Sequence, residues 1–330
     1  MTRRRWLALT TAATGCAPRR SPSSELTLRV GVVQSSQSSG PLFLAVEQGY
    51  FREEGLNLEV DRAQVTGLHI SALAAGKLDA CLVAMSPAIP NAVVQGAPVR
   101  LVAARQSASR VCGGWGQIFA RLSAFPGGLK DFRELKGKRI AYSSPGSLSD
   151  FALDMVLESV ALSRADIQAV AIKRQEAILA LLAGNLDAVV QSSGTKEIPA
   201  ERRAGFGFFP GAELIHPTLQ TVYIGFGERL RGEKRDAGIR FLRAFRRGSS
   251  DFFANRNPAF MRKWTLEMGD PEAPIANCPQ EARNDGAVDP ASVKVYLDWA
   301  VRRKHIEAAV APETLIDATL MQDLKSRGSA

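Results

Sequence analysis

Several patterns are absent from this sequence of 330 residues, and each absence excludes a class of protein. No run of about 18 apolar residues occurs, so we expect no membrane-spanning helix. The four cysteines and three histidines include no pair at metal-ligand spacing, so we expect no metal site and no cofactor. The net charge of +9 is scattered and forms no basic helix face, so we expect no nucleic-acid partner.

What is present is typical of a globular protein, with 45% hydrophobic and 23% charged residues. The length allows two lobes of roughly 100–200 residues, each with its own core. Cys81 lies in the apolar run LDACLVA, which predicts a buried side chain. Whether Cys112 and Cys278 form a disulfide stays open at this point.

The N-terminus, MTRRRWLALTTAATGCAPRR, has the layout of an export signal, with a basic start, a short apolar stretch and small residues. Arg3 and Arg4 resemble the pair of a twin-arginine signal, and ATGC resembles a bacterial lipobox with Cys16 as the lipidated residue. Ala13 departs from that pattern, which usually has leucine there. The alternative is an ordinary secretion signal with an incidental Cys16. We expect an exported protein, periplasmic or at the cell surface, with residues 1–25 as signal and tether.

An internal repeat is the most informative feature of the chain. Residues 72–83, ALAAGKLDACLV, and residues 180–191, ALLAGNLDAVVQ, are identical at seven of twelve positions. Each copy reads as a helix end, a glycine stop and a buried strand, with Gly76 and Gly184 suited to a left-handed backbone. A strand, a helix and another strand precede each copy, so the order β-α-β-α-β occurs twice.

This alternation predicts an α/β protein with two lobes, each a mainly parallel sheet flanked by helices, and a ligand cleft between them. Further strands are expected at 99–105 and 220–227, where the chain crosses between lobes. We therefore assign 26–105 and 221–330 to lobe I and 106–220 to lobe II. Residues 228–328 are expected to be mostly helical, with one helix opening at Asp289-Pro290.

The loops after the expected strands are rich in serine, glutamine and glycine. Ligands of open α/β sheets bind at the carboxyl ends of strands, and helix N-termini there favour anions. We therefore expect a small, anionic or strongly polar ligand. The expected ligand-binding residues are Ser35, Ser36, Gln37, Ser38, Phe43, Met85, Ser86, Ser144, Gly146, Ser147, Arg174, Gln191 and Ser192.

Each of these residues also has an ordinary structural interpretation. A single serine serves more often as a helix cap or turn residue. Arg174 is suited to pairing with an anion, but a solvated surface charge is the more common role for such an arginine. Phe43 and Trp115 are suited to core packing, and His69 on a helix face is expected to be structural.

The sequence resembles the solute-binding proteins of ABC importers for alkanesulfonates, taurine, nitrate and thiamine-pyrimidine precursors. The resemblance covers roughly residues 27–320 and rests on segments in the order of that family: 41–60, 72–80, 93–103, 135–141 and 288–300. It implies the type 2 periplasmic-binding-protein fold, whose lobes close on a ligand by hinge motion. It also implies a monomer that delivers its solute to the permease and ATPase subunits of an importer, with membrane attachment only through a lipid anchor.

Two alternatives remain. The fold also carries enzymes, but desulfinase-like relatives have a nucleophilic cysteine in the loop after the first strand, which here has only serines and glutamines. Pyrimidine-synthase-like relatives have a cysteine cluster and a histidine, and here AMSPA has neither. None of His69, His216 and His305 lies beside a plausible nucleophile in sequence. The second alternative is a solute sensor that feeds no transporter.

Overall fold

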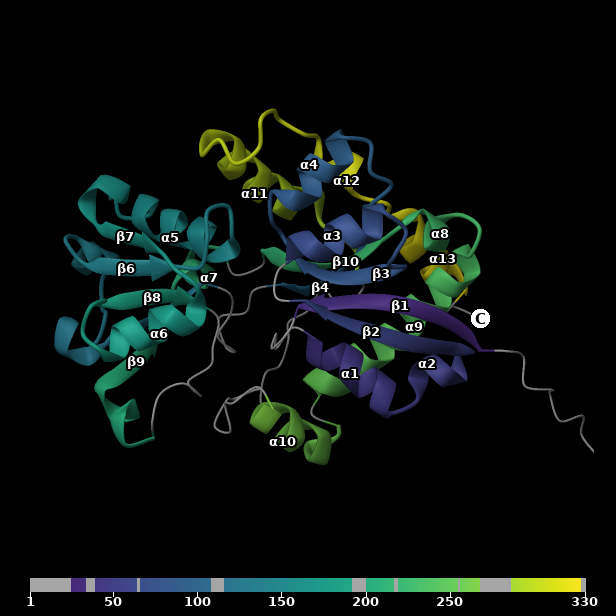
Figure 1. Ribbon diagram of the computed structural model, residues 1–330, viewed down its shortest axis with the longest axis horizontal. Helices are drawn as coiled ribbons and strands as arrows, with labels where there is room; N and C mark the ends of the chain where they lie inside the picture. The colour runs from purple at the N-terminus through teal and green to yellow at the C-terminus, as the bar shows by residue number, and fades with distance from the viewer. Residues whose placement is uncertain are drawn as a thin grey trace, which may run out of the picture.

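The computed structural model describes residues 25–33, 39–63, 66–107, 116–191, 200–216, 219–254, 256–267 and 286–327. Two five-stranded sheets lie side by side, sheet A to the right and sheet B to the left in Figure 1. In spatial order, sheet A contains β2 (Leu56–Ala63), β1 (Leu26–Val33), β3 (Ala80–Ala84), β10 (Gln220–Phe226) and β4 (Arg100–Ser107). Sheet B contains β7 (Gln168–Ala171), β6 (Arg139–Tyr142), β8 (Ala188–Gln191), β5 (Gln117–Arg121) and β9 (Phe206–Phe209).

The two sheets have the same plan. In each, the first three strands in spatial order are parallel, and the fourth runs antiparallel to both of its neighbours. The chain passes from sheet A to sheet B between β4 and β5 and returns between β9 and β10. These are mixed sheets flanked by helices, which agrees with the predicted α/β class. The limits of the two lobes at 105/106 and 220/221 stay a prediction.

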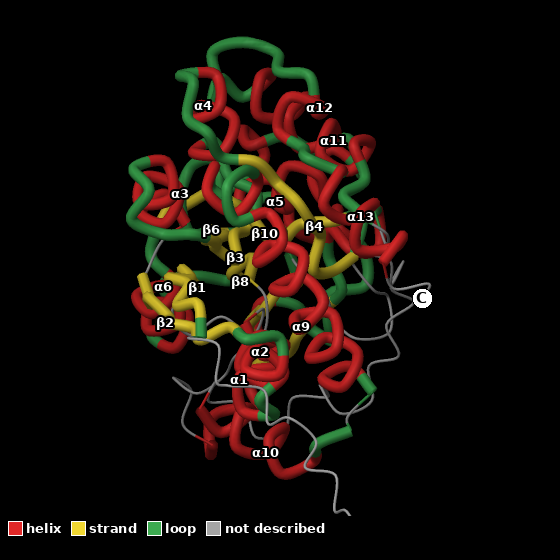
Figure 2. The backbone as a smooth tube through the Cα atoms, turned by 90° about the vertical axis from the view of Figure 1, so that its right-hand side faces the viewer, coloured by secondary structure: helices red, strands yellow, loops and turns green. Residues whose placement is uncertain are grey.

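Helices cover both faces of sheet A. Below it in Figure 1 lie α1 (Gly40–Glu47), α2 (Tyr50–Glu53) and α9 (Arg235–Phe253), and above it lie α3 (Thr66–Ala74) and α4 (Ala88–Val94). Figure 2 shows the same arrangement from the side, with α10 (Pro258–Glu267) beyond α1. Near the end of β10 and along α9 lie α8 (Glu228–Arg231) and α13 (Thr319–Arg327).

Sheet B is covered by α5 (Leu148–Glu158) on one face and α6 (Arg174–Leu182) on the other, with α7 (Ala212–Ile215) beside α5. Short 3-10 helices are η2 (Leu122–Ala124), η3 (Phe132–Leu135), η4 (Arg164–Asp166) and η5 (Ala200–Gly205). The C-terminal helices α11 (Pro290–Arg302) and α12 (Pro312–Leu315) lie above the strands in Figure 1. One hydrophobic cluster continues from the α3 face of sheet A through α11 to the α5 face of sheet B, and includes Val83, Tyr296 and Phe151.

The sequence repeat is also a repeat of structure. Asp79 accepts a hydrogen bond from the backbone N–H of Arg29 at 2.9 Å, and Asp187 accepts the equivalent bond from Arg139 at 2.9 Å. Each carboxylate also pairs with arginine, Asp79 with Arg229 and Asp187 with Arg121 and Arg139. The aspartate of each L-D-A run therefore joins its strand to the strand beside it and to an arginine.

The predicted strand at 220–227 is confirmed within one residue, and the two strands expected before the first copy of the repeat lie at Leu26–Val33 and Leu56–Ala63. Gly76 and Gly184 have φ of +68° and +80°, as predicted for residues that follow a helix end. The sequence did not predict β5 and β9. None of the helices in the described part of the chain is both long and apolar enough to cross a membrane.

Candidate ligand-binding site

The carboxyl ends of the two sheets meet where the loops after β3 and β6 touch. Gly146, in the loop after β6, lies against Pro87, in the loop after β3, so closely that a Cβ at Gly146 would be 2.5 Å from Pro87 Cγ. The φ of Gly146 is +75°, which further favours glycine. The strand ends at which ligands of this fold class bind therefore face each other across the two sheets.

Helix α11 joins this contact from above. The Tyr296 hydroxyl donates to the carbonyl oxygen of Gly146 at 2.6 Å, and the indole Nε1–H of Trp299 donates to Asp154 Oδ2 at 2.8 Å. Arg303 lies 3.0 Å from the same carboxylate, which is 5% exposed. Buried carboxylates need such partners, so α11 is fixed to α5 by paired charges as well as by apolar packing.

Asp150, 1% exposed, is the second buried carboxylate of α5. It accepts from the backbone N–H of Gly146 at 2.9 Å and from the guanidinium of Arg164. His305 Nε2 lies 3.2 Å from its Oδ2, although no hydrogen bond of good geometry forms there. The N-terminus of α5 thus already has a carboxylate of its own.

The helices after β1 and β6 differ at their N-termini. In α5, the Ser147 hydroxyl caps the helix by accepting from the Asp150 N–H at 3.2 Å. In α1, Ser39 is the N-cap residue but makes no side-chain cap bond, and the first turn has no acidic residue. Helix N-termini carry partial positive charge and unpaired N–H groups. Of these two helices, α1 therefore has the N-terminus without a side-chain cap or an acidic residue in its first turn.

Buried polar atoms without a hydrogen-bond partner gather at the same edge of sheet A. Within the described part of the chain they include the hydroxyls of Ser39 and Ser86 and both ring nitrogens of His69. Ser39 precedes α1, Ser86 follows β3, and His69 is in the first turn of α3. An unpaired buried polar group costs about 1–3 kcal/mol, which a ligand with complementary groups recovers. These atoms mark the edge of sheet A as the candidate site.

His69 is 2% exposed and packs over β1, where a Cβ at Gly31 would be 2.6 Å from its Cδ2. Burial lowers the pKa of His69 below its ordinary value, although Asp61, 3.8 Å from Nε2, opposes that shift. The imidazole is therefore neutral at pH 7 and offers one donor and one acceptor.

The sequence-predicted site residues fall into three groups. Ser35, Ser36, Gln37, Ser38, Ser192 and Cys16 lie outside the described residues, as does the side chain of Gln191 at the end of β8. Phe43 and Ser86 lie at the carboxyl edge of sheet A, and Met85 is 2% exposed within the hydrophobic core. Across the contact, Ser144 is exposed, Arg174 is half-buried, Gly146 is buried and Ser147 caps α5. Their role as ligand contacts stays a prediction.

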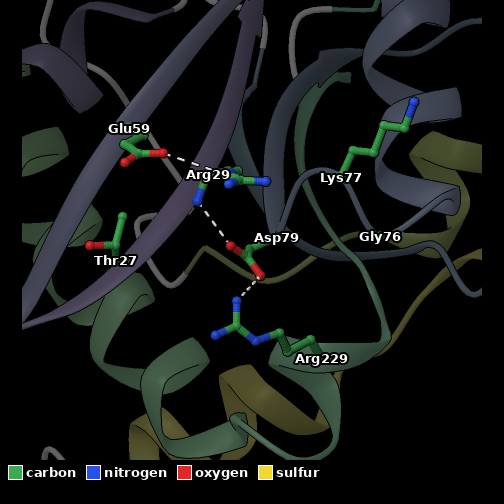
Figure 3. Close-up of a pocket in the computed structure, with 7 residues that line it drawn as sticks. All are labelled: Thr27, Arg29, Glu59, Gly76, Lys77, Asp79 and Arg229. Carbon is green, nitrogen blue, oxygen red and sulfur yellow. Dashed lines mark hydrogen bonds and ion pairs between the residues drawn. The ribbon is translucent and has the colours of Figure 1, made fainter.

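A pocket of about 390 Å³ lies at the opposite, amino end of the parallel strands of sheet A (Figure 3). It is lined by Thr27, Arg29, Glu59, Gly76, Lys77, Asp79 and Arg229. Asp79 points between Arg29 and Arg229 and bonds to both, at 2.9 Å and 2.7 Å (Figure 3). Because this carboxylate already serves the repeated strand–loop contact, we assign the pocket a structural role.

Comparison with models of known protein families identifies the family of this chain. The model of the family described as NMT1/THI5 like matches residues 36–259, more than half of the chain. The chain belongs to the NMT1/THI5-like family. No curated protein sequence matches it. In this NMT1/THI5-like chain the matched residues include β2 to β10, and thus both sheets except β1.

Solved structures share the fold. A putative periplasmic sulfonate-binding protein SsuA from Methylobacillus flagellatus KT has a TM-score of 0.73 at 14% identity, covering 93% of this chain and 96% of its own. The alkanesulfonate-binding SsuA from Xanthomonas axonopodis pv. citri, bound to MOPS, has a TM-score of 0.66 at 17% identity, covering 90% and 99%. A mutant of the desulfinase DSZB, in complex with biphenyl-2-sulfinic acid, has a TM-score of 0.64 at 14% identity. The match covers 92% of this chain and 99% of that one. The NMT1/THI5-like chain therefore has the periplasmic-binding-protein fold.

Proposed function

We propose that this protein is the extracytoplasmic solute-binding component of an ABC importer. It captures a small anionic organic solute, sulfonate- or carboxylate-like, between the two lobes and closes on it by hinge motion. The observation that carries the proposal is the contact of Gly146 with Pro87, which brings together the carboxyl ends of two sheets of the same plan. The chain crosses between these sheets twice, and such crossings are where hinge rotation is absorbed.

The solute class follows from the charge and the donors at this edge. Helix α1 starts there with an uncapped N-terminus and no acidic residue in its first turn. The fold neighbours named above include sulfonate-binding proteins, which supports an oxyanion as the recognised group. Delivery to permease and ATPase subunits, export, a lipid anchor at Cys16 and a monomeric state belong to the same proposal.

The proposal includes no catalytic step. Cys81 is 0% exposed in the hydrophobic core, and burial raises its pKa to about 12. A thiol of that kind is not ionised near pH 7 and is shielded from a solute, so it is unsuited to act as a nucleophile. Cys112 and Cys278 lie outside the described residues. The desulfinase neighbour makes turnover the alternative that an experiment must address.

A thermal-shift screen of the purified protein tests the proposal. The panel contains taurine, alkane- and arylsulfonates, nitrate, aromatic carboxylates and pyrimidine precursors. A ligand at about 100 times its dissociation constant stabilises a protein by about 2.7 kcal/mol. We expect one chemical class of anion to raise the melting temperature, and the hit to be recovered unchanged after incubation. Failure of every solute to stabilise a folded sample contradicts solute binding, and conversion of the hit supports the enzyme alternative.

A further inference from the structure

Helix α10 brings a tryptophan to the buried N-terminus of α1, which has no side-chain cap. Trp264 is 3% exposed, and the Nε1–H of its indole has no hydrogen-bond partner in the part of the chain that the structure describes. A Cβ at Gly40, the first residue of α1, would lie 2.3 Å from Cε2 of Phe252 and 2.9 Å from that nitrogen. The donor is therefore beside the helix start, next to the unpaired hydroxyl of Ser39, which is 2% exposed.

The ring of Phe252 is the nearest group to this point, and the polar groups beside it include donors and one positive charge. The first turn of α1 leaves backbone N–H groups without intrahelical partners, apart from Pro41, which has none. The guanidinium of Arg62, at the end of β2, lies 4.3 Å from the centroid of the Phe43 ring, and that ring is 5.2 Å from Trp264. Asp61 precedes Arg62 in the strand and faces His69 instead, because successive strand side chains point to opposite faces.

An indole nitrogen is a donor only, as are backbone N–H groups. The group that satisfies them must accept hydrogen bonds, and the helix N-terminus favours one with negative charge. We propose that Ser39, the N-terminus of α1 and Trp264 form a subsite for the oxyanion end of the solute, with Trp264 Nε1–H as a specificity-determining donor. This inference rests on the proposed function and adds the chemistry of the recognised group.

The alternative is that Trp264 serves packing alone. Its ring stacks on Phe260 at 5.9 Å and belongs to a cluster with Leu44, Phe252 and Met261 that is separate from the sheet cores. Packing accounts for the ring but not for an unpaired N–H, since phenylalanine or leucine would pack without that cost. The cluster meets the core of sheet A at Phe43, which packs against both.

The experiment compares Trp264→Phe with Phe260→Leu, using methanesulfonate as the probe. Trp264→Phe removes the N–H and retains an aromatic ring, whereas Phe260→Leu alters the same cluster and retains the N–H. We expect Trp264→Phe to weaken methanesulfonate binding in calorimetry about tenfold or more, the effect of losing one bond to a charged acceptor. Ser39→Ala is expected to weaken it in the same direction, and Phe260→Leu to change it less than about threefold.

A second readout detects the contact directly. The Trp264 indole resonance, assigned by its absence in Trp264→Phe, is expected to shift on adding methanesulfonate to ¹⁵N-labelled protein. An unmoved resonance at saturation, or equal affinity in wild type and Trp264→Phe, overturns the subsite. So does a wild type that fails to bind methanesulfonate at about 10 mM.

These results separate the subsite from the proposed function. Stabilisation by a neutral solute, with no binding of methanesulfonate, removes the subsite and leaves a solute-binding protein. A shift of the Trp264 resonance by methanesulfonate, with conversion of the bound organic solute on incubation, supports the subsite and contradicts the proposed function.

Discussion

Tyr296 and Gly146 are 150 residues apart in sequence and are joined by a hydrogen bond of 2.6 Å between the tyrosine hydroxyl and the glycine carbonyl. The bond connects α11 to the loop after β6. Beyond α11, the chain continues to Ile316, which forms a β-bridge with Leu101 of β4 in sheet A. The C-terminal segment is therefore bound to the loop after β6 through Tyr296 and to the amino end of β4 through Ile316.

Replacing Tyr296 with phenylalanine is expected to lower the free energy of unfolding by about 1–3 kcal/mol, because the buried carbonyl of Gly146 loses its partner. Urea unfolding measures the loss. Tyr223→Phe is the control, since the Tyr223 hydroxyl donates at 2.7 Å to Gln220 within the same element. Both variants are expected to lose stability, but only Tyr296→Phe to change solute affinity; equal affinities in the two would contradict a role in closure.

Gly146→Ala places a methyl group against Pro87 in a left-handed backbone. Gly76→Ala imposes the same backbone penalty, of about 1–2 kcal/mol, but has nothing within 4 Å of the added Cβ. We expect Gly146→Ala to be the more destabilised and to bind solute more weakly, as measured by urea unfolding and calorimetry. If the two alanine variants behaved alike, the contact between the loops would be of no consequence.

Ser147→Ala is expected to cost about 1 kcal/mol, because the hydroxyl caps α5. Ser144→Ala is expected to leave stability unchanged, because Ser144 is exposed and its hydroxyl makes no hydrogen bond to the described residues. Chemical unfolding measures both. Calorimetry on the same two proteins tests the sequence-based prediction that these serines contact the solute; unchanged affinity in both would refute it.

Asp187 makes stability depend on acid pH. Burial alone would raise its pKa, but hydrogen bonds from the Arg139 side chain and backbone and from Arg121 outweigh burial and hold the pKa well below the ordinary value. The unfolded chain therefore binds the proton at higher pH than the folded protein does. The stabilisation is complete above the unfolded pKa of about 3.9 and is lost as the pH falls toward the folded pKa.

Asp187→Asn is expected to cost about 2 kcal/mol at pH 7, less than a fully buried pair because both arginines are partly exposed. It is also expected to flatten the decline of stability between about pH 5 and 3 relative to wild type. Asp298→Asn, which removes an exposed carboxylate from α11, is the control. A decline in Asp187→Asn as steep as in wild type would contradict the assigned pairing.

Much of the fold can be predicted from the sequence because each repeated L-D-A run is a local pattern that indicates a buried strand. Each has apolar residues in a short run after a glycine that follows a helix end, and the structure pairs the first run with β1 and the second with β6. The strands β5 and β9 cannot be predicted from a local pattern of this kind. Both are short, and β5 pairs with strands about 70 and 90 residues away, so its partners and not its own pattern determine it.

The site was predictable only as a set of loops. Ser86 and Phe43 follow from the rule that ligands bind beyond the carboxyl ends of strands. Trp264 does not, because it reaches α1 from a helix more than 200 residues further along the chain. Ser39 lies in the predicted loop-to-helix segment, and the missing acid in the first turn of α1 was the signal that distinguishes it from Ser147.

The place of β10 in sheet A sets an order of assembly. All strands of sheet B lie within residues 117–209, whereas β3 and β4 are joined only through β10, which ends at Phe226. A ribosome therefore releases every strand of sheet B before it completes the strand that closes sheet A. The strands of sheet B are therefore able to pair before sheet A is complete, whereas the bond from Trp299 of α11 to Asp154 of α5 forms only after residues 290–302 have been made.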